Sequence, residues 1–271
     1  MENENIDPKT IASFGDEWAR FDQSDAPEAE LQRYFDLYFR VFPWHQLPAN
    51  AEGFDMGCGS GRWAKFVAPR VGTLHCIDPS SALDVAKRNL QSLSNIFYHQ
   101  ASTNTAPLAH GSQDFGYSLG VLHHIPDTEA AMKQCVKLLK PNAPFLVYLY
   151  YRFDNRPVWF RALWALSDLV RRGIHRLPGG LKHSATDIIA VSIYWPLARL
   201  ASLLNKPSMP LYAYRNASLY TMRTDSRDRF GTPLEHRFTR RELEAMMQRA
   251  GLRNITFSET EPYWCAVGIK S

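Results

Sequence analysis

The sequence has few cysteines and no long apolar run. Its four cysteines, Cys58, Cys76, Cys135 and Cys265, form no CxxC pair among 271 residues. This spacing predicts neither a zinc cage nor a disulfide framework, so we expect reduced thiols and no metal site. No uninterrupted apolar stretch reaches the roughly 18 residues of a membrane span, and the polar start MENENIDPKT lacks the regions of a signal peptide. The sequence therefore favours a cytoplasmic protein without a membrane span.

Positive charge is unevenly distributed. The net charge is +4, but residues 151–241 hold 16 Lys/Arg against 6 Asp/Glu, hence +10, and the rest holds 15 against 21, hence −6. Such a segment suits an anionic ligand, a membrane surface or an acidic partner, although a solvated, Arg-rich helical surface explains it equally well. Nucleic acid is disfavoured, because no RNA-binding module is recognisable and the charge is intermixed with core-like aromatic residues. The sequence predicts no oligomeric state.

Short apolar segments alternate with helical ones in the order of a parallel α/β sheet. With 45% apolar residues, the chain can bury a substantial core. Five predicted strands precede residue 152, and two more close the chain. The strand segments are GFDM, LHCID, NIFYHQ, DFGYSL, APFLVYLYY, NITFSE and YWCAVGIK.

Helical segments flank and interrupt this order. SDAPEAELQRYFDLYFRVFP predicts a capped N-terminal helix. Two amphipathic helices are expected after the fifth strand, the second kinked or split at Pro196. Thr239 and Glu242 then predict a capping box. The expected division is an N-terminal helical cap (1–45), a sheet core (46–151 and 238–271), and a helical, basic, aromatic-rich insert that forms a substrate lid (152–237).

The stretch FDMGCGSGRW carries the first motif with chemical meaning. Gly57, Gly59 and Gly61 alternate between a predicted strand and a predicted helix, directly after Asp55. Glycines allow a sharp turn and a close approach of the backbone to a ligand, and the helix start offers free amides. The spacing differs from the dinucleotide fingerprint GxGxxG and lacks the Lys-Ser/Thr of a P-loop. No dedicated pyrophosphate cradle is expected.

Asp78, in LHCIDPS, ends the next predicted strand 17 residues beyond Gly61. A carboxylate at this place in a doubly wound fold can accept hydrogen bonds from both ribose hydroxyls of a nucleoside. Asp78 or Ser80 could instead cap the helix that follows. The glycine loop upstream favours the ribose role.

Together these motifs resemble the class I S-adenosylmethionine-dependent methyltransferases, over roughly residues 50–150 and 238–270. The matching pieces are DMGCGSG, the acidic residue of CIDPS, QDFGYSLGVLHHIPD and LKPNAPFLVYL. The resemblance implies a Rossmann-like, doubly wound, mostly parallel seven-stranded sheet whose last strand is antiparallel, with S-adenosylmethionine as cofactor. The cofactor-binding residues that it implies are Asp55, Gly57, Cys58, Gly59, Gly61, Asp78, Pro79, Ala101, Ser102 and Leu119.

Two positions depart from or complicate this resemblance. The family often carries Asp where this chain has Ser102, so Ser102, Asn104 or a water must take over adenine recognition. The neighbouring His123 and His124 suggest a metal, but adjacent residues rarely point at one ion and no third ligand stands at metal spacing. We expect one of them to shape the pocket, and we keep His124 as a candidate base.

The N-terminal stretch SFGDEWARFD has two interpretations. Trp18 and Phe21 could cover the cofactor, since aromatic faces stabilise a sulfonium, with Arg20 meeting a carboxylate. They could also be a hydrophobic staple for the helix that follows. Trp18 is therefore a candidate cofactor contact.

The stretch YLYYRFDNRPVWF joins the fifth predicted strand to the insert. Alternation along the strand turns Tyr150 or Tyr151 toward the cofactor side. Asn155 either reaches the same pocket or caps the next helix. The candidate catalytic residues are Tyr150, Asn155, Tyr194 and His124.

Methyl transfer depends on alignment and desolvation more than on a dedicated base, so the sequence leaves three functions open. The first is a methyltransferase for a small, partly apolar or anionic metabolite. The second is a methyltransferase-like enzyme that cyclises S-adenosylmethionine to azetidine-2-carboxylate and releases methylthioadenosine. The third is a non-catalytic S-adenosylmethionine-binding protein.

Overall fold

The computed structural model describes residues 5–271, which form two compact units. The first, here called the sheet unit, contains the described residues up to Asp22, Gln32–Arg152 and Leu234–Ser271. The second, here called the helical unit, contains Gln23–Leu31 and Phe153–Pro233. The helical unit therefore includes a piece of the N-terminal region that the sequence analysis assigned to a separate cap.

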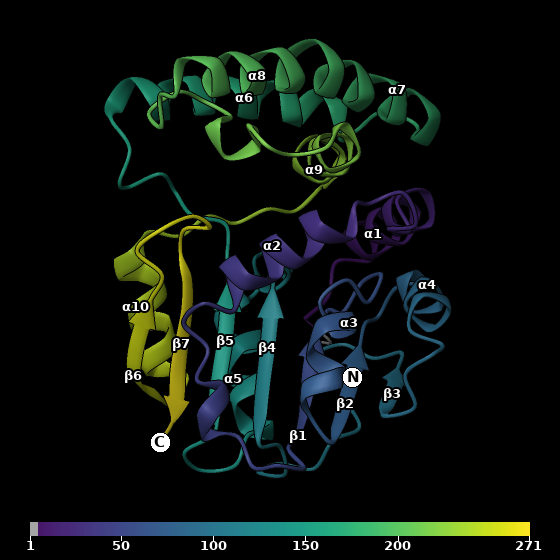
Figure 1. The fold of residues 1–271 in the computed structure, drawn as a ribbon, viewed down its shortest axis with the longest axis vertical. Helices are drawn as coiled ribbons and strands as arrows, with labels where there is room; N and C mark the ends of the chain where they lie inside the picture. The colour runs from purple at the N-terminus through teal and green to yellow at the C-terminus, as the bar shows by residue number, and fades with distance from the viewer. Residues whose placement is uncertain (1–4) are drawn as a thin grey trace. The chain divides into compact units, whose positions relative to one another are not determined.

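The sheet unit is built on seven strands in the order β3-β2-β1-β4-β5-β7-β6 (Figure 1). Strand β7 is antiparallel to both neighbours and all other pairings are parallel, as the sequence predicts. The strands are β1 (Glu52–Met56), β2 (Thr73–Ile77), β3 (Ile96–His99), β4 (Phe115–Leu119), β5 (Pro144–Tyr148), β6 (Leu252–Phe257) and β7 (Cys265–Lys270). The strand order reverses between β1 and β4, and open α/β sheets bind ligands at the carboxyl ends beside such a reversal.

Two glycines allow the central strands to pack closely. Every residue of β4 is buried. A Cβ atom at Gly53 would clash with the ring of Phe115, and one at Gly116 would clash with the ring of Phe54. The absent side chains make room for these two phenyl rings, so β1 and β4 pack closely near their amino ends.

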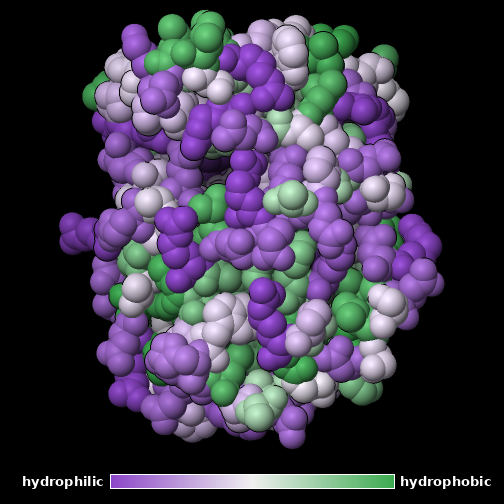
Figure 2. Space-filling model, viewed as in Figure 1, coloured by the Kyte–Doolittle hydropathy of each residue, from purple (hydrophilic) through white to green (hydrophobic). Residues whose placement is uncertain are grey.

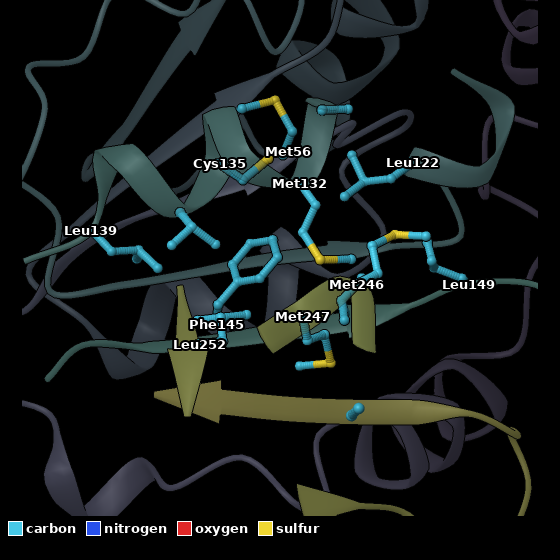
Figure 3. Packing of buried hydrophobic residues seen from close by; sticks show 14 of the residues in the cluster. Met56, Leu122, Met132, Cys135, Leu139, Phe145, Leu149, Met246, Met247 and Leu252 are labelled. Carbon is cyan, nitrogen blue, oxygen red and sulfur yellow. The ribbon is translucent and has the colours of Figure 1, made fainter. Parts of the chain in front are cut away.

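Helices α5 (Thr128–Leu138) and α10 (Arg240–Arg249) contribute to an apolar cluster of the sheet unit. Figure 3 shows Met132 of α5 and Met246 of α10 close to Phe145 of β5. Helix α10 begins with the predicted capping box, in which Thr239 and Glu242 each bond the other's backbone amide. The cap fixes where the chain returns to the sheet after the helical unit.

Aromatic side chains form a second group on the sheet unit. The rings of Phe35 and Phe39 stack at 4.4 Å between centroids, and Phe39 also meets Tyr117 of β4 edge to face at 5.2 Å. Such contacts add to the burial of large apolar area. The remaining helices are α1 (Pro8–Arg20), α2 (Glu28–Tyr38), α3 (Ala64–Val67) and α4 (Ala82–Asn89). The sequence analysis foresaw α2, α3 and α4 but not α1, which Asp7 caps through a bond from the Thr10 amide.

The helical unit consists of α6 (Val158–Ile174), α7 (Gly179–Ile189), α8 (Trp195–Leu204) and α9 (Leu219–Gly231). The helix changes form just before Pro196, close to the predicted kink or split, because Ala190–Tyr194 make a π-helical turn that joins α7 to α8. A proline lacks the amide hydrogen that a regular helix needs, and the wider turn just before it keeps the helix continuous. Helix α9 was not predicted, because its segment LYTMRTDSRDRFG has no apolar period.

Among residues 5–271, one helix is long and apolar enough to cross a membrane by length and composition. It is the continuous Gly179–Leu204, with a mean hydropathy of 1.4 over its most apolar window, of which 22% is buried. The search for uninterrupted apolar runs missed this helix, since Lys182, Asp187 and Arg199 interrupt its sequence.

Candidate active site

The predicted glycine loop follows β1 and adopts left-handed backbone at each glycine. The φ angles of Gly57, Gly59 and Gly61 are 80°, 52° and 78°. The amides of Gly57 and Cys58 donate to the carbonyl of Ile77, at 2.7 and 3.1 Å. These bonds hold the loop against the carboxyl end of β2, so the loop is fixed on both sides.

The surroundings of the loop are too tight for side chains at these positions. A Cβ atom at Gly57 would clash with the Val121 side chain, and one at Gly61 would lie 2.6 Å from Leu90. A Cβ atom at Gly59 would come within 3.0 Å of the Trp18 indole nitrogen. The structure thus brings Trp18, on α1, against the loop that the sequence associates with the cofactor.

Asp78 connects β2 to the glycine loop. Its Oδ2 accepts from the Gly59 amide at 2.9 Å, and its Oδ1 accepts from the amide and hydroxyl of Ser80, at 2.8 and 2.6 Å. Burial raises the pKa of the carboxyl, and the bonds from Ser80 and Gly59 counteract this. The amide of Ala82, the first residue of α4, donates to the Ser80 hydroxyl, whereas the N-cap position is Ser81, whose side chain makes no capping bond. A carboxylate oxygen can accept more than one bond, which leaves capacity on Asp78 for a ligand.

Asp55 is a buried acid beneath the glycine loop. The residue is 1% exposed, and its Oδ2 has no hydrogen-bond partner among the described residues. Burial, and then the charge of Asp78, raise the pKa of Asp55 to about 8 against the opposing effect of Tyr117 and Arg62. The carboxyl is therefore mostly protonated at neutral pH and can donate a hydrogen bond. A buried carboxyl oxygen without a hydrogen-bond partner, next to a glycine loop, fits the binding of a polar ligand such as S-adenosylmethionine.

The segment after β3 has fewer hydrogen-bonding groups available for a ligand than the sequence analysis expected. Ala101 and Ser102 are buried and Pro79 is half-buried. The Ser102 amide donates to the Thr105 hydroxyl at 2.9 Å, and the Ser102 hydroxyl lies 3.1 Å from the same oxygen. Both polar groups of Ser102 are thus used within their own loop. Leu119, which ends β4, is also buried.

A second cluster lies at the carboxyl ends of β4 and β5. The ring of Tyr150 lies over that of His123, with centroids 3.9 Å apart, and Arg237 stacks over Tyr150 at 4.9 Å from its centroid. Arg237 forms an ion pair with Glu235 at 2.7 Å, in which both side chains are nearly buried. Tyr150 thus faces the histidines, whereas Tyr151 contacts Tyr263.

Backbone bonds tie the segment 234–238 to this cluster. The amide of His236 donates to the carbonyl of His123, and the amide of Phe238 donates to the carbonyl of Tyr150, both at 2.9 Å. The sequence analysis missed Glu235 and Arg237. The sequence feature that could have revealed them is the acidic and basic pair, two residues apart, in LEHRFTR just before the predicted capping box.

The two histidines differ in environment. His123 Nδ1 lies 3.4 Å from the Tyr150 amide, and burial, then the positive charges of His124 and Arg237, hold the pKa of His123 well below its usual value. His124 Nδ1 lies 2.6 Å from the carbonyl oxygen of Leu234, which requires the proton on Nδ1 and leaves Nε2 as the acceptor nitrogen. Within residues 5–271, no group of three or more His, Cys, Asp or Glu side chains is arranged to hold a metal.

Two predicted catalytic residues belong to the helical unit. Asn155 is exposed, and it does not cap α6, whose N-cap position is Pro157. Tyr194 is 8% exposed in the apolar cluster of the helical unit, with its ring 5.3 Å from that of Tyr214. The structure therefore does not bring these residues together with Tyr150 and His124 in one unit.

Comparisons with known proteins agree with this geometry. A family profile described as a methyltransferase domain matches residues 54–147, which run from β1 to β5. The ubiquinone biosynthesis O-methyltransferase of Escherichia coli is 26% identical over 194 residues, which are 64% of this chain and 75% of that protein.

Two solved structures share the fold at low identity. Phospholethanolamine N-methyltransferase 2 of Haemonchus contortus, solved with S-adenosylhomocysteine, has a TM-score of 0.50 at 14% identity over 85% of this chain and 39% of that one. A possible exported protein of Bordetella parapertussis has a TM-score of 0.53 at 15% identity over 91% and 70%.

The sheet order and the glycine loop define a Rossmann-like α/β fold. Within this fold, residues 54–147 match a methyltransferase domain. The cofactor expected for such a domain is S-adenosylmethionine, which supplies a sulfonium-activated methyl group when bound.

Proposed function

We propose that this protein transfers a methyl group from S-adenosylmethionine to a small, partly apolar or anionic metabolite. The main support for this proposal is the stack of His123, Tyr150 and Arg237 at the carboxyl ends of β4 and β5. This is the edge of the sheet that also holds the glycine loop, and catalysis by alignment needs donor and acceptor sites side by side. The relative that acts in ubiquinone biosynthesis is an O-methyltransferase, which is consistent with a small acceptor.

The glycine-loop residues supply the cofactor site in this proposal. Asp78 accepts hydrogen bonds from ribose hydroxyls, because its buried oxygens already stand at the end of β2. Protonated Asp55 supports the loop from below and donates to a polar group of the ligand. Trp18 offers an aromatic face to a cation near Gly59. The other proposed cofactor contacts are Gly57, Cys58, Gly61, Pro79, Ala101, Ser102 and Leu119.

The cluster around Tyr150 supplies the acceptor site. Arg237, held by Glu235, is a fixed positive charge for an anionic acceptor, and the Tyr150 ring gives an apolar surface. His124 Nε2 is the nitrogen that takes a proton from an acceptor hydroxyl. The helical unit serves as the substrate lid, with Asn155 and Tyr194 as its proposed contributions.

Product analysis without any acceptor tests the proposal first. We expect purified protein with S-adenosylmethionine alone to form neither S-adenosylhomocysteine nor methylthioadenosine above background. Adding a panel of simple phenols and aromatic carboxylates should produce S-adenosylhomocysteine. Methylthioadenosine accumulating without an acceptor would instead identify the cyclisation to azetidine-2-carboxylate. Cofactor binding with no product across the panel would favour a non-catalytic binding protein.

The two halves of the site are tested by separate variants. Asp78→Ala removes the proposed ribose contact and should weaken S-adenosylhomocysteine binding at least about tenfold in calorimetry. Arg237→Met should leave that affinity unchanged but raise the KM for a carboxylate acceptor about tenfold or more. Arg249→Met is the matched control, since Arg249 forms an exposed pair with Glu129. An unchanged KM in Arg237→Met would remove this residue from the acceptor site.

A further inference from the structure

Helix α6 presents an apolar stripe to solvent. Trp159, Leu166 and Leu169 are 52%, 60% and 61% exposed, and they recur at the three-to-four residue spacing of one helix face. Soluble proteins rarely leave such a stripe uncovered. The exposed large apolar residues of α6 are Val158, Trp159, Leu163, Leu166, Leu169 and Val170.

The continuous helix Gly179–Leu204 has a second apolar stripe. Ile188 and Leu203 are 65% and 82% exposed, and Trp195 lies between them with 46% exposed. Figure 2 shows hydrophobic side chains at the surface of the helical unit. The exposed residues of this helix are Leu181, Ile188, Val191, Ile193, Trp195, Leu200, Leu203 and Leu204. We call these and the six residues of α6 the apolar face.

The polar bonds of these helices lie on their inner side. Helix α9 contacts both α6 and α7. The Ser226 hydroxyl of α9 donates to the Thr186 carbonyl at 2.8 Å, and Arg223 pairs with Asp187 at 2.9 Å. Arg199 donates to the carbonyls of Arg215 and Ala217. These polar contacts join the helices to one another, while the large apolar side chains named above remain exposed.

Charge around the apolar face is almost entirely positive. Residues 153–233 hold 12 Lys/Arg and 5 Asp, hence +7. Of the five Asp residues, all except Asp154 are buried or half-buried. Arg172 keeps 63% of its side chain exposed although it contacts Asp168. The exposed basic residues on and after the two helices are Arg161, Arg172, Arg176, Arg199 and Lys206.

We propose that the apolar face binds the surface of an anionic lipid bilayer, with the helices lying in the plane of the interface. Exposed leucines enter the acyl boundary, Trp159 and Trp195 lie at headgroup level, and the flanking Arg residues meet lipid phosphates. A spanning arrangement would carry the Asp187–Arg223 pair into hydrocarbon, at high cost. Pairing with a second copy would bring two strongly positive surfaces together.

Sedimentation with lipid vesicles tests this binding on the full-length protein. We expect the protein to pellet with phosphatidylglycerol vesicles, to pellet less with phosphatidylcholine vesicles, and to be released by high salt. Leu166→Glu combined with Ile188→Glu should reduce the bound fraction at least about tenfold. Phe97→Glu is the matched control, because Phe97 is 53% exposed on β3 of the sheet unit. This control should bind vesicles like the wild type.

Three outcomes would overturn the proposal. The first is no pelleting with phosphatidylglycerol, or equal pelleting of the double variant and the wild type. The second is a wild-type dimer in sedimentation velocity without vesicles that the double variant converts to a monomer, which would assign the apolar face to a second copy. The third is bound protein that resists extraction at high pH, which would replace the in-plane geometry by insertion. Circular dichroism and melting temperature verify that both variants are folded.

Discussion

The two units of this chain differ in where their large apolar side chains lie. In the sheet unit, the strands are filled with apolar residues, and Phe97 is its one exposed large hydrophobic residue among those the structure describes. In the helical unit, Ala190, Tyr194 and Phe230 belong to a buried apolar cluster, while leucines of α6 and α8 remain exposed. Exposed apolar patches of this kind mark interaction surfaces. The difference is therefore consistent with the proposal that only the helical unit contacts a lipid surface.

The largest expected effect comes from overpacking the sheet unit. Gly53→Ala places a methyl group where the Phe115 ring lies, and overpacking should lower the free energy of unfolding by about 3 kcal/mol. Gly180→Ala in α7 is the matched control, since a Cβ atom there meets nothing within 4 Å. Urea denaturation measures both. Equal denaturation midpoints for the two variants would mean that the sheet unit accommodates an added methyl group as readily as the helical unit does.

The second prediction uses the buried Asp55. Its folded pKa of about 8 lies above the usual 3.8, so between these values the folded protein holds a proton that the unfolded chain has released. Stability is therefore lost as pH rises through this window, by at most about 1.4 kcal/mol per pH unit. Asp55→Asn should remove this loss, so its melting temperature should rise relative to wild type between pH 5 and 8.

The exposed Asp84 provides the control for this titration. Its side chain is 68% exposed beside Lys87, so Asp84→Asn should follow the wild-type pH profile. If Asp55→Asn also followed that profile, Asp55 would be ionised in the folded protein. The ionised Asp55 carboxylate would then need a stabilising partner other than Tyr117 and Arg62.

The smallest effect concerns the return of the chain to the sheet unit. Thr239→Ala removes one half of the capping box of α10 and should cost about 1 kcal/mol of unfolding free energy. Ser184→Ala in the helical unit is the comparison, since its hydroxyl bonds only a carbonyl of its own helix. An equal or larger loss for Ser184→Ala would mean that the Thr239 cap does not stabilise the start of α10.

The sheet unit could be predicted from the sequence because its signals are local and ordered. The local signals are seven apolar segments, three alternating glycines and a capping box, and each indicates one kind of structure. The strand order followed from the resemblance of these motifs to a known family. The helical unit could not be predicted to the same depth. Helix α9 lacks an apolar period because it buries Arg227 against its neighbours, and the π turn before Pro196 has no signature of its own.

The candidate site divides in the same manner. The glycine loop and Asp78 were identified because each stands at the end of a strand, where position and chemistry coincide. Glu235 and Arg237 were missed because the bonds that bring them to Tyr150 join residues about 86 positions apart. Of the two alternatives for Asn155, only the helix cap is excluded, because the N-cap position of α6 is Pro157, which makes no side-chain bond.

The hydrogen bonds at both ends of the helical unit have a consequence for how this chain could change. The Phe238 amide donates to the Tyr150 carbonyl, and the Arg152 amide donates to the Phe238 carbonyl, both at 2.9 Å, so the points where the chain leaves and rejoins the sheet unit are adjacent. A segment whose ends already meet can be lengthened or exchanged at little entropic cost. Residues 153–233 could therefore vary in length between two fixed points of the sheet unit, as long as their contacts with Gln23–Leu31 are kept.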